Sequence, residues 1–268
     1  MRKSLIGVLA LFVMLSFNIG IVAAEGNSAN PVLNTDKVNV GAIGITYLAP
    51  KGKKTKVVIE KRDRRYIYNI SAAKTYNDFP LQMGNGEYTI KVMENTTGNS
   101  YKVVAKEKVE VNIANDKLVY LNSVQNVRWD DSMEAVKKAK ALTKNARNDS
   151  EKVKLIYNYI VNNIKYDFKK ANEVNYDYLP DIDNTLKVKY GICYDYAALF
   201  AAMLRSADVP TKLVTGNTAF LDEYHAWNEV YIDGKWQIVD TTIGASEKAS
   251  KKAEMFKSKQ QYMTAKEY

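Results

Sequence analysis

Two kinds of hydrophobic pattern divide this chain. Between residues 38 and 113, short runs alternate apolar and polar positions with the period of two that is typical of half-buried strands, and Gly- and Asn-rich turns separate several of them. The runs lie at 43–47, 56–60, 66–70, 88–92, 101–104 and 109–113. We predict an antiparallel β-sandwich over residues 36–115, of roughly immunoglobulin-like type.

Beyond a connector at 115–129, the spacing of apolar residues becomes helical. Asp131, with Glu134 three residues later, is a capping signal for a helix over 133–143. A second helix is predicted from Asp149 or Ser150 to residue 164, with Val153, Ile156, Tyr157 and Ile160 on one face. These patterns predict an α+β domain over 130–245, so the whole chain is expected to have α+β class.

The last segment, 246–268, is rich in Lys and Ala and contains Phe256 and Tyr262. We predict either a solvated tail or a terminal helix that docks through these two aromatic residues.

The N-terminal residues carry a signal for the location of the protein. Arg2 and Lys3 precede an uncharged stretch over 5–22, and Ala23 and Ala24 supply the small residues of a cleavage site. This pattern predicts a secretory signal peptide over 1–24, and an uncleaved membrane anchor is the alternative. Cleavage after Ala24 removes two positive charges, so the formal net charge falls from +9 to +7.

Composition narrows the chemistry further. The chain has one cysteine, Cys193, and one histidine, His225, so a Cys/His zinc site and an internal disulfide are both excluded. Asp177, Asp181 and Asp183 form only a weak acidic cluster, and we expect neither a metal nor a cofactor. No phosphate loop or nucleic-acid motif is present. The excess of Lys suits an anionic cell envelope, although Lys spread along a chain is also the ordinary pattern of a solvated surface.

Cys193 lies in Gly191-Ile192-Cys193-Tyr194-Asp195, ahead of apolar residues at helical spacing. The thiol is therefore predicted in the first turn of a buried helix, where unpaired N–H groups and the helix dipole favour a thiolate. The N–H of Cys193 is also placed to donate to a developing oxyanion.

His225 lies in a run that predicts a strand ending at Asp233-Gly234, and the next strand, 235–240, returns antiparallel. A two-residue turn pairs positions whose numbers sum to 467. It places His225 opposite Thr242, with Asp240 diagonally adjacent on the same face. That separation suits a carboxylate that orients an imidazole.

Three blocks carry a resemblance: Gly-x-Cys-x-Asp-Tyr-Ala at 191–197, His-Ala-Trp-Asn-Glu-Val at 225–230 and Trp-x-x-Val-Asp-Thr-Thr at 236–242. Over about 150–242, the chain resembles the transglutaminase-like superfamily, which is related to the papain-type cysteine peptidases. The resemblance implies a papain-like domain with Cys193 as nucleophile, His225 as general base and acid, and Asp240 as its orienter. It also implies that Tyr166 helps to stabilise the oxyanion.

Structural interpretations exist for several of these residues. A single Cys is commonly a small buried hydrophobe, and a single His is commonly a hydrogen-bonded structural residue. Trp227 and Trp236 are expected in the core or a cleft wall. Asn228 and Glu229 match the family block, but we expect them at a solvated strand end.

The resemblance implies an enzyme that transfers acyl groups through a thioester and acts on peptide or carboxamide bonds. The predicted signal peptide and the single cysteine favour an exported protein of bacterial type. Animal transglutaminases carry a Trp shortly before the His, whereas this chain has Phe220 to Tyr224 there. Peptidase or amidase activity is therefore expected ahead of protein-glutamine transamidation. The expected partner is a protein or peptide substrate, with cell-wall peptide as one candidate. An envelope-binding module without activity on the same scaffold remains an alternative.

Overall fold

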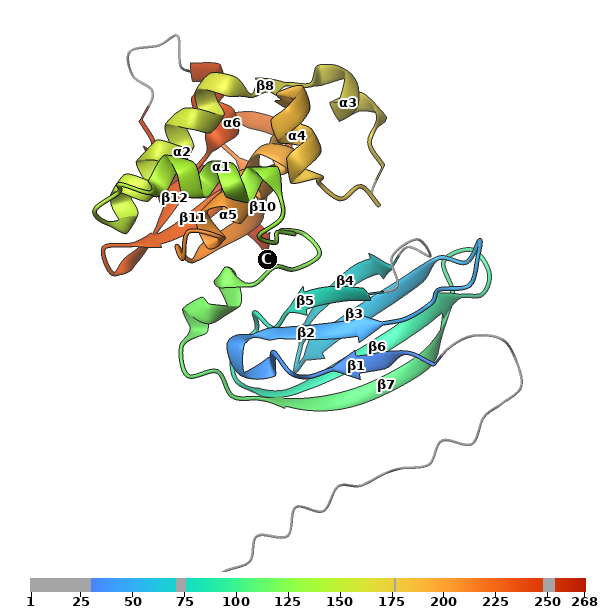
Figure 1. The fold of residues 1–268 in the computed structure, drawn as a ribbon. Helices are drawn as coiled ribbons and strands as arrows, with labels where there is room; N and C mark the ends of the chain where they lie inside the picture. Colours follow the sequence, from blue (N-terminus) through green and yellow to red (C-terminus); the bar gives the residue numbers. More distant parts are fainter. Residues whose placement is uncertain (1–29, 71–75, 176, 248–253) are drawn as a thin grey trace, which may run out of the picture.

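The computed structural model describes residues 30–70, 76–175, 177–247 and 254–268. It confirms the α+β class: a β-rich N-terminal domain is followed by a C-terminal domain in which helices pack around a sheet (Figure 1). The predicted signal peptide, 1–24, lies outside the described residues.

The N-terminal domain consists of two antiparallel sheets. One contains β1 (Val32–Asn34), β2 (Ala42–Thr46) and β5 (Tyr76–Pro80), and the other has the order β4 (Arg64–Ile70), β3 (Thr55–Lys61), β6 (Gly86–Asn95) and β7 (Tyr101–Val111). Their facing residues share one core that includes Ile43, Phe79, Ile59, Tyr88 and Ile90. Because alternate side chains of each strand enter this core, the period-two pattern follows directly from burial on one face.

The strands depart from the sequence prediction in two places. The runs predicted at 101–104 and 109–113 belong to one strand, β7, which continues to Val111. β5 was not predicted, because Asp78 and Pro80 are poor strand residues; both are accommodated because β5 lies at a sheet edge. β4 pairs with β3 rather than with β5, unlike the constant-type immunoglobulin arrangement.

The C-terminal domain is built on a five-stranded sheet with the order β13-β12-β11-β10-β14. Its strands are β10 (Thr211–Thr218), β11 (Leu221–Ile232), β12 (Lys235–Val239), β13 (Phe256–Lys257) and β14 (Tyr262–Glu267). A short parallel pair, β8 (Lys165–Tyr166) and β9 (Tyr190–Gly191), lies among the helices. The helices are α1 (Glu134–Thr143), α2 (Asp149–Asn163), α3 (Phe168–Glu173), α4 (Ile182–Val188), α5 (Cys193–Arg205) and α6 (Thr241–Glu247). Short 3₁₀ turns occupy η1 (Val38–Val40), η2 (Asp116–Leu121) and η3 (Lys259–Gln261).

Helix α5 is the centre of this domain, and every residue from Asp195 to Arg205 is buried. It contacts β10 and β11 on one side and α1, α2 and α4 on the other. A helix that is apolar all round belongs inside a core, which explains the run of Ala, Leu, Phe and Met after Cys193.

The predicted cap of α1 was wrong. Asp131 pairs instead with Lys140, at 2.7 Å. The N–H groups of Glu134 and Ala135 donate to the carboxylate of Asp183, at 3.0 and 2.8 Å, so a residue 48 positions away from Ala135 caps the helix. A local sequence motif could not reveal this cap, because it depends on how α4 packs beside α1.

In the predicted segment 246–268, docking through Tyr262 is confirmed, since this residue is buried against Trp227. The predicted form was wrong, because the segment docks as strands and not as a terminal helix. Among the described residues of this segment, Phe256–Lys257 pairs with β12, and Tyr262–Glu267 pairs with β10. Without β14, the N–H and C=O groups along β10 would form an open sheet edge. Gly216 permits the close approach, because a Cβ there would lie 2.0 Å from the carbonyl oxygen of Met263.

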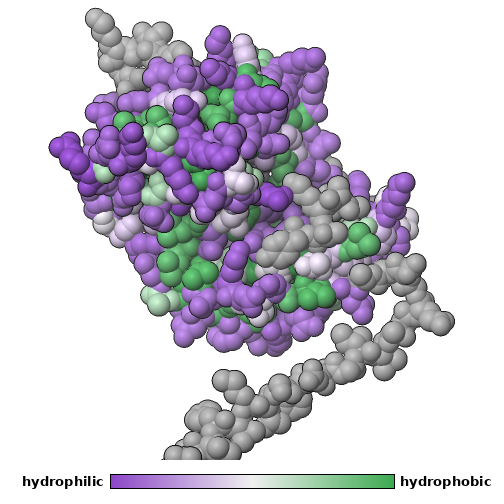
Figure 2. All heavy atoms as spheres, in the orientation of Figure 1, coloured by the Kyte–Doolittle hydropathy of each residue, from purple (hydrophilic) through white to green (hydrophobic). Residues whose placement is uncertain are grey.

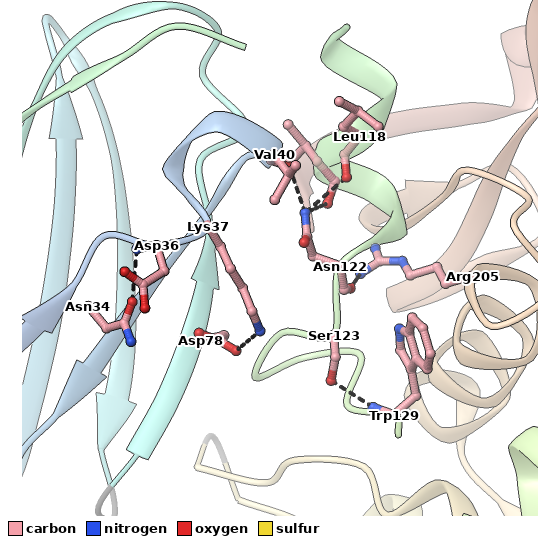
Figure 3. Close-up of polar contacts among 11 residues, drawn as sticks. Asn34, Asp36, Lys37, Val40, Asp78, Leu118, Asn122, Ser123, Trp129 and Arg205 are labelled. Carbon is pink, nitrogen blue, oxygen red and sulfur yellow. Dashed lines mark hydrogen bonds and ion pairs between the residues drawn. The ribbon is translucent and has the colours of Figure 1, made fainter. Parts of the chain in front are cut away.

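The connector ties the two domains together through partly buried polar contacts (Figure 3). Asn122 donates to the carbonyl of Val40 at 2.8 Å, and its own carbonyl accepts from the Arg205 guanidinium at 2.7 Å. Arg205 also donates to the carbonyls of Thr211 and Tyr268, both at 2.8 Å. One side chain at the end of α5 therefore holds the connector, the start of β10 and the residue that follows β14.

No helix in the described ranges is long and apolar enough to cross a bilayer. In the view of Figure 2, hydrophilic residues cover most of the surface of both domains, with smaller apolar patches between them.

Candidate active site

Cys193 is the first residue of α5, as its sequence position indicated. The first N–H groups of a helix have no acceptor within the helix, so the thiol and the Cys193 N–H lie at the positive end of the helix dipole. The residue is partly exposed and lines a cleft, so a substrate can approach the sulfur.

Asp195 fixes the start of this helix, although no role was predicted for it from the sequence. Its carboxylate is fully buried and accepts from the Ile192 N–H at 2.9 Å and from the Lys170 ammonium at 2.7 Å. The Tyr178 hydroxyl donates to its other oxygen. The signal in the sequence was an acidic residue at the third helical position, which is typical of a capping box.

His225 lies in β11, buried to 2% exposure, and its Nε2 is 2.8 Å from the Asp240 Oδ2. The predicted hairpin register holds from Asn228↔Val239 to Ile232↔Lys235. The ladder ends there, however, because the chain turns into α6 at Thr241; the predicted pairing of His225 with Thr242 was therefore wrong.

Asp240 is held by four hydrogen bonds. Its Oδ1 accepts the N–H groups of Thr242 and Ile243, each at 3.0 Å, so the residue caps α6. Its Oδ2 accepts the Tyr262 hydroxyl at 2.9 Å as well as the imidazole of His225. These donors satisfy a carboxylate that is fully buried, and they fix its direction toward His225.

Tyr262 was expected only to dock the last segment. Its hydroxyl instead reaches the carboxylate that holds the imidazole, and its ring packs 5.0 Å from that of Trp227. Nothing in the spacing of residues 225, 240 and 262 indicates this contact, since it depends on the pairing of β14 with β10.

The imidazole of His225 contacts both the Asp240 carboxylate and the Cys193 thiol. Because Asp240 engages Nε2, the other ring nitrogen, Nδ1, is the one available to the sulfur. Burial alone would lower the pKa of His225, but the hydrogen bonds and charges of Asp240 and Cys193 outweigh burial and raise this pKa to about 9. At neutral pH the ring therefore carries a proton, and its positive charge lies beside the sulfur.

Tyr166 lies on β8, which pairs with β9 so that Tyr166 is opposite Gly191. Burial raises the pKa of its hydroxyl, and the nearby negative charge of a Cys193 thiolate adds to that rise. Tyr166 is thus close to the sulfur, but it is not among the residues that line the cleft. Its role toward an oxyanion stays a prediction.

The environment of Trp227 and Asn228 connects the histidine strand to the rest of the site. Trp227 is buried and stacks beside His225, with ring centres 6.3 Å apart, whereas Trp236 packs against Tyr120. The expectation of a solvated position for Asn228 was wrong: it is fully buried, and its amide donates to the carbonyls of Ala197 and Lys212, both at 3.0 Å. Asn228 therefore ties β11 to the helix that carries Cys193.

The cleft has a volume of about 530 Å³, within the range of ordinary ligand sites. Residues of both domains and of the connector line it. They are Ile67, Tyr68, Asn69, Gln125, Asn126, Asp177, Tyr178, Leu179, Cys193, Tyr194, Thr215, Tyr224, His225, Ala226, Lys266 and Tyr268.

The three aspartates of the predicted acidic cluster have separate structural roles. Asp181 caps α4, Asp183 caps α1, and Asp177 lines the cleft. Within the described ranges, no group of three or more His, Cys, Asp or Glu side chains has an arrangement that suits a metal ion.

Comparison with known proteins agrees with the resemblance seen in the sequence. Residues 136–241 match the model of the transglutaminase-like superfamily, and this match includes Cys193, His225 and Asp240. The matched segment is therefore a transglutaminase-like domain. Tyr262 and the N-terminal sheets lie outside it.

Kyphoscoliosis peptidase of Mus musculus is 34% identical over 114 residues, which are 39% of this chain and 17% of that protein. The chain thus spans about a sixth of the length of this relative. Among solved structures, a candidate cysteine protease from Cytophaga hutchinsonii is 18% identical, with a TM-score of 0.42 and coverage of 75% and 74% of the two chains. Red sea bream transglutaminase is 14% identical, with a TM-score of 0.36 and coverage of 75% and 48%. The family assignment rests on the sequence match.

Proposed function

We propose that the transglutaminase-like domain of this chain is a cysteine-dependent acyl-transfer enzyme that acts on peptide or carboxamide bonds. The observation that carries the proposal is the His225 imidazole, which contacts the Cys193 thiol and the Asp240 carboxylate at the wall of an open cleft. A structural histidine needs neither an accessible sulfur nor a cleft beside it.

The chemistry follows from these contacts. The Cys193 thiolate attacks the carbonyl carbon, and the electron pair of the C=O bond moves to the oxygen. This oxyanion accepts a hydrogen bond from the Cys193 N–H and is predicted to accept another from the Tyr166 hydroxyl. When the C–N bond breaks, Nδ1 of the imidazolium gives its proton to the leaving amine. The product is a thioester on Cys193 and a neutral imidazole.

The second half of the reaction regenerates the thiolate. Imidazole takes a proton from water or from a second amine, which attacks the thioester carbonyl and displaces the sulfur. Asp240 keeps the ring oriented and stabilises its charged form in both halves, and its own hydrogen bonds keep it from swinging away.

We propose hydrolysis as the principal outcome. The cleft is open, and Tyr224, next to His225 in the chain, is 57% exposed. The exposed rim of the cleft at Tyr224 supports ready access of water to a thioester on Cys193. Transamidation would require an amine to compete with that water.

Alkylation of Cys193 by iodoacetamide between pH 5 and 9 tests the proposal. Because the imidazolium favours the thiolate, we expect the wild-type protein at pH 6 to react at least about 10-fold faster than His225→Ala. Equal rates in the two proteins at pH 6 would show that the sulfur and the imidazole do not work together. Cys193→Ala is the control for labelling elsewhere.

A second experiment separates the two outcomes of acyl transfer. A glutamine-containing protein is offered together with a labelled primary amine, and ammonia release and label incorporation are followed in the same sample. Ammonia or new amino termini without label support hydrolysis, whereas label incorporation at a comparable rate supports transamidation. Absence of both, with an unreactive thiol, supports a binding module without activity.

Export and an envelope substrate are part of the proposal. They are supported by the sequence pattern of residues 1–24 and by the net positive charge. Residues 25–268 incubated with purified peptidoglycan or with denatured proteins, with Cys193→Ala as the matched control, would identify the class of substrate. Fractionation of cells that express the full chain tests the location.

A further inference from the structure

The N-terminal domain forms one wall of the candidate active-site cleft. Ile67, Tyr68 and Asn69 of β4 line it, together with Gln125 and Asn126 of the connector. Figure 1 shows β4 at the edge of the sandwich nearest the C-terminal domain, below the segment that joins α3 to α4. This wall lies outside the segment that matches the family model, which begins at residue 136.

β4 is the terminal strand of its four-stranded sheet, and no strand in the described ranges pairs with its outer side. The register shows which backbone groups point outward. The carbonyl of Lys54 accepts from the Asn95 N–H on the β6 side, so the even-numbered residues of β3 direct their backbone groups toward β6. In β4, the residues opposite these even-numbered positions therefore direct their N–H and C=O groups away from the sheet. These residues are Arg65, Ile67 and Asn69.

An independent contact shows the same direction. The Gln125 side-chain amide donates to the Asn69 carbonyl at 2.8 Å, which is possible only if that carbonyl points outward. Gln125 is itself held by its N–H, which donates to the Asp78 carbonyl at 2.9 Å. The amide of Gln125 thus makes one of the bonds that a neighbouring strand would make. Two residues along, Ile67 presents its N–H and C=O on the same edge, beside a side chain that is 41% exposed.

We propose that the outer edge of β4 binds the substrate as an added strand, so that the substrate is an extended, unfolded polypeptide segment. This inference rests on the proposed acyl-transfer function. An edge of alternating donors and acceptors at the spacing of a strand matches the repeating backbone of a polypeptide, which a sugar chain or a small amide lacks. Because β4 and Cys193 line the same cleft, a segment bound along β4 lies close to the sulfur.

Selectivity follows from this mode of binding. The bonds are made to the substrate backbone, so many sequences are accepted, while a folded protein is refused because its strands are already paired. Apart from Cys193 and His225, the cleft walls contribute one acidic and one basic side chain, Asp177 and Lys266, and several tyrosines, so neither sign of charge is strongly favoured.

The test measures binding of fluorescein-labelled casein, an unfolded polypeptide, to full-length Cys193→Ala by fluorescence anisotropy. Ile67→Pro removes the outward N–H and blocks strand addition, while an edge strand tolerates proline there. We expect Ile67→Pro to raise the Kd for casein about 10-fold, and Ile67→Ala, which keeps the backbone, to raise it less than about 3-fold. Equal Kd values for Ile67→Pro and Ile67→Ala, or no binding of casein at all, would overturn the inference.

A second measurement leaves the protein unchanged. A casein peptide that competes with the labelled casein is compared with a copy in which alternate backbone amides are N-methylated. Loss of competition by the methylated copy supports strand addition, and equal competition contradicts it.

Failure of this inference is distinguishable from failure of the proposed function. The rate of Cys193 alkylation, with its dependence on His225, is measured for Ile67→Pro in a protein that retains the thiol. Normal alkylation with unchanged casein binding eliminates the β4 site alone. Alkylation that does not depend on His225 eliminates the acyl-transfer proposal whatever casein does.

Discussion

In the N-terminal domain, Glu94 is buried against the hydroxyl of Tyr47; in the C-terminal domain, Asp240 is buried against the hydroxyl of Tyr262. The further partners differ. The Glu94 carboxylate lies 3.4 Å from the exposed ammonium of Lys102. The Oδ2 of Asp240, which accepts from Tyr262, is also hydrogen-bonded to the imidazole of His225. The hydrogen bond from Tyr47 lowers the pKa of Glu94, so this carboxylate stays charged and inert.

The comparison shows that a buried carboxylate held by a tyrosine is a structural device that either domain can use. It gains a chemical role only where its second partner can move a proton and touches a nucleophile. Under the proposed function, that condition is met beside α5 and not at β6, and the variants below test the difference in matched pairs.

The largest expected effect comes from Asp240→Asn. An amide can still cap α6 through its oxygen, but it no longer favours the charged imidazole or its orientation, so we expect turnover to fall about 10³- to 10⁴-fold. The rate of product release from a peptide substrate is measured in parallel with the melting temperature. Glu94→Gln is the matched control and is expected to retain turnover within about 2-fold. Similar losses in both variants would remove the distinction between the two carboxylates.

Stability should depend on pH through His225. Its folded pKa is raised to about 9 from an ordinary value of 6.5, so the folded state binds a proton more tightly than the unfolded chain. The stabilisation is complete below pH 6.5 and is lost as the pH rises through 9, with a total on the order of 3 kcal/mol.

Urea unfolding of the wild type and of His225→Gln at pH 6 and pH 9.5 measures this effect. We expect the wild type to lose more free energy of unfolding than the variant over this range. Because the chain has one histidine, the difference between the two proteins reports on this site. Parallel pH profiles for the two proteins would contradict the contact of the imidazole with Asp240 and Cys193.

Asn228→Ala tests the link between the strand of His225 and the helix of Cys193. The carbonyls of Ala197 and Lys212 lose the hydrogen bonds that the Asn228 amide donates, and we expect the free energy of unfolding to fall by about 2 kcal/mol. Asn162→Ala removes an exposed amide that donates to a carbonyl of its own helix and should cost under about 0.5 kcal/mol. Equal costs in chemical denaturation would show that burial of Asn228 does not matter.

The smallest effect is expected from Tyr262→Phe. Loss of one hydrogen bond to Asp240 should lower kcat about 5- to 10-fold with little change in KM, because the carboxylate is less firmly oriented. The limbs of the pH–rate profile should move, because the carboxylate that holds His225 has lost one of its hydrogen bonds. Tyr47→Phe removes the equivalent bond to Glu94 and should leave the profile where it is. A shift in both, or in neither, would argue against a positioning role for Tyr262.

Part of the architecture was readable from local pattern. Each sheet of the sandwich has one face toward the core, so alternation along 43–47, 56–60, 66–70 and 88–92 indicated strands. The apolar run after Cys193 indicated a buried helix, and Asp233-Gly234 indicated the turn that sets the register of β11 and β12. These features depend on neighbours in the chain, so the sequence carries them directly.

Other features depend on partners that are distant in the chain. Asp183 caps α1, Asn228 anchors α5, and Asp195 is held by Lys170 and Tyr178. The last strand, β14, was not predicted as a strand, because its pairing with β10 leaves most of its side chains exposed and no alternating apolar pattern marks it.

The sequence by itself determined the α+β class, the helix that presents Cys193 and the hairpin that brings His225 near Asp240, because spacing along the backbone controls each of these. Only the tertiary structure decided that β14 supplies Tyr262 to Asp240 and that β4 of the other domain walls the cleft. The physical reason is that hydrogen bonds between distant strands form wherever unsatisfied backbone and buried polar groups meet in space. That meeting depends on how whole sheets pack and not on any local run of residues.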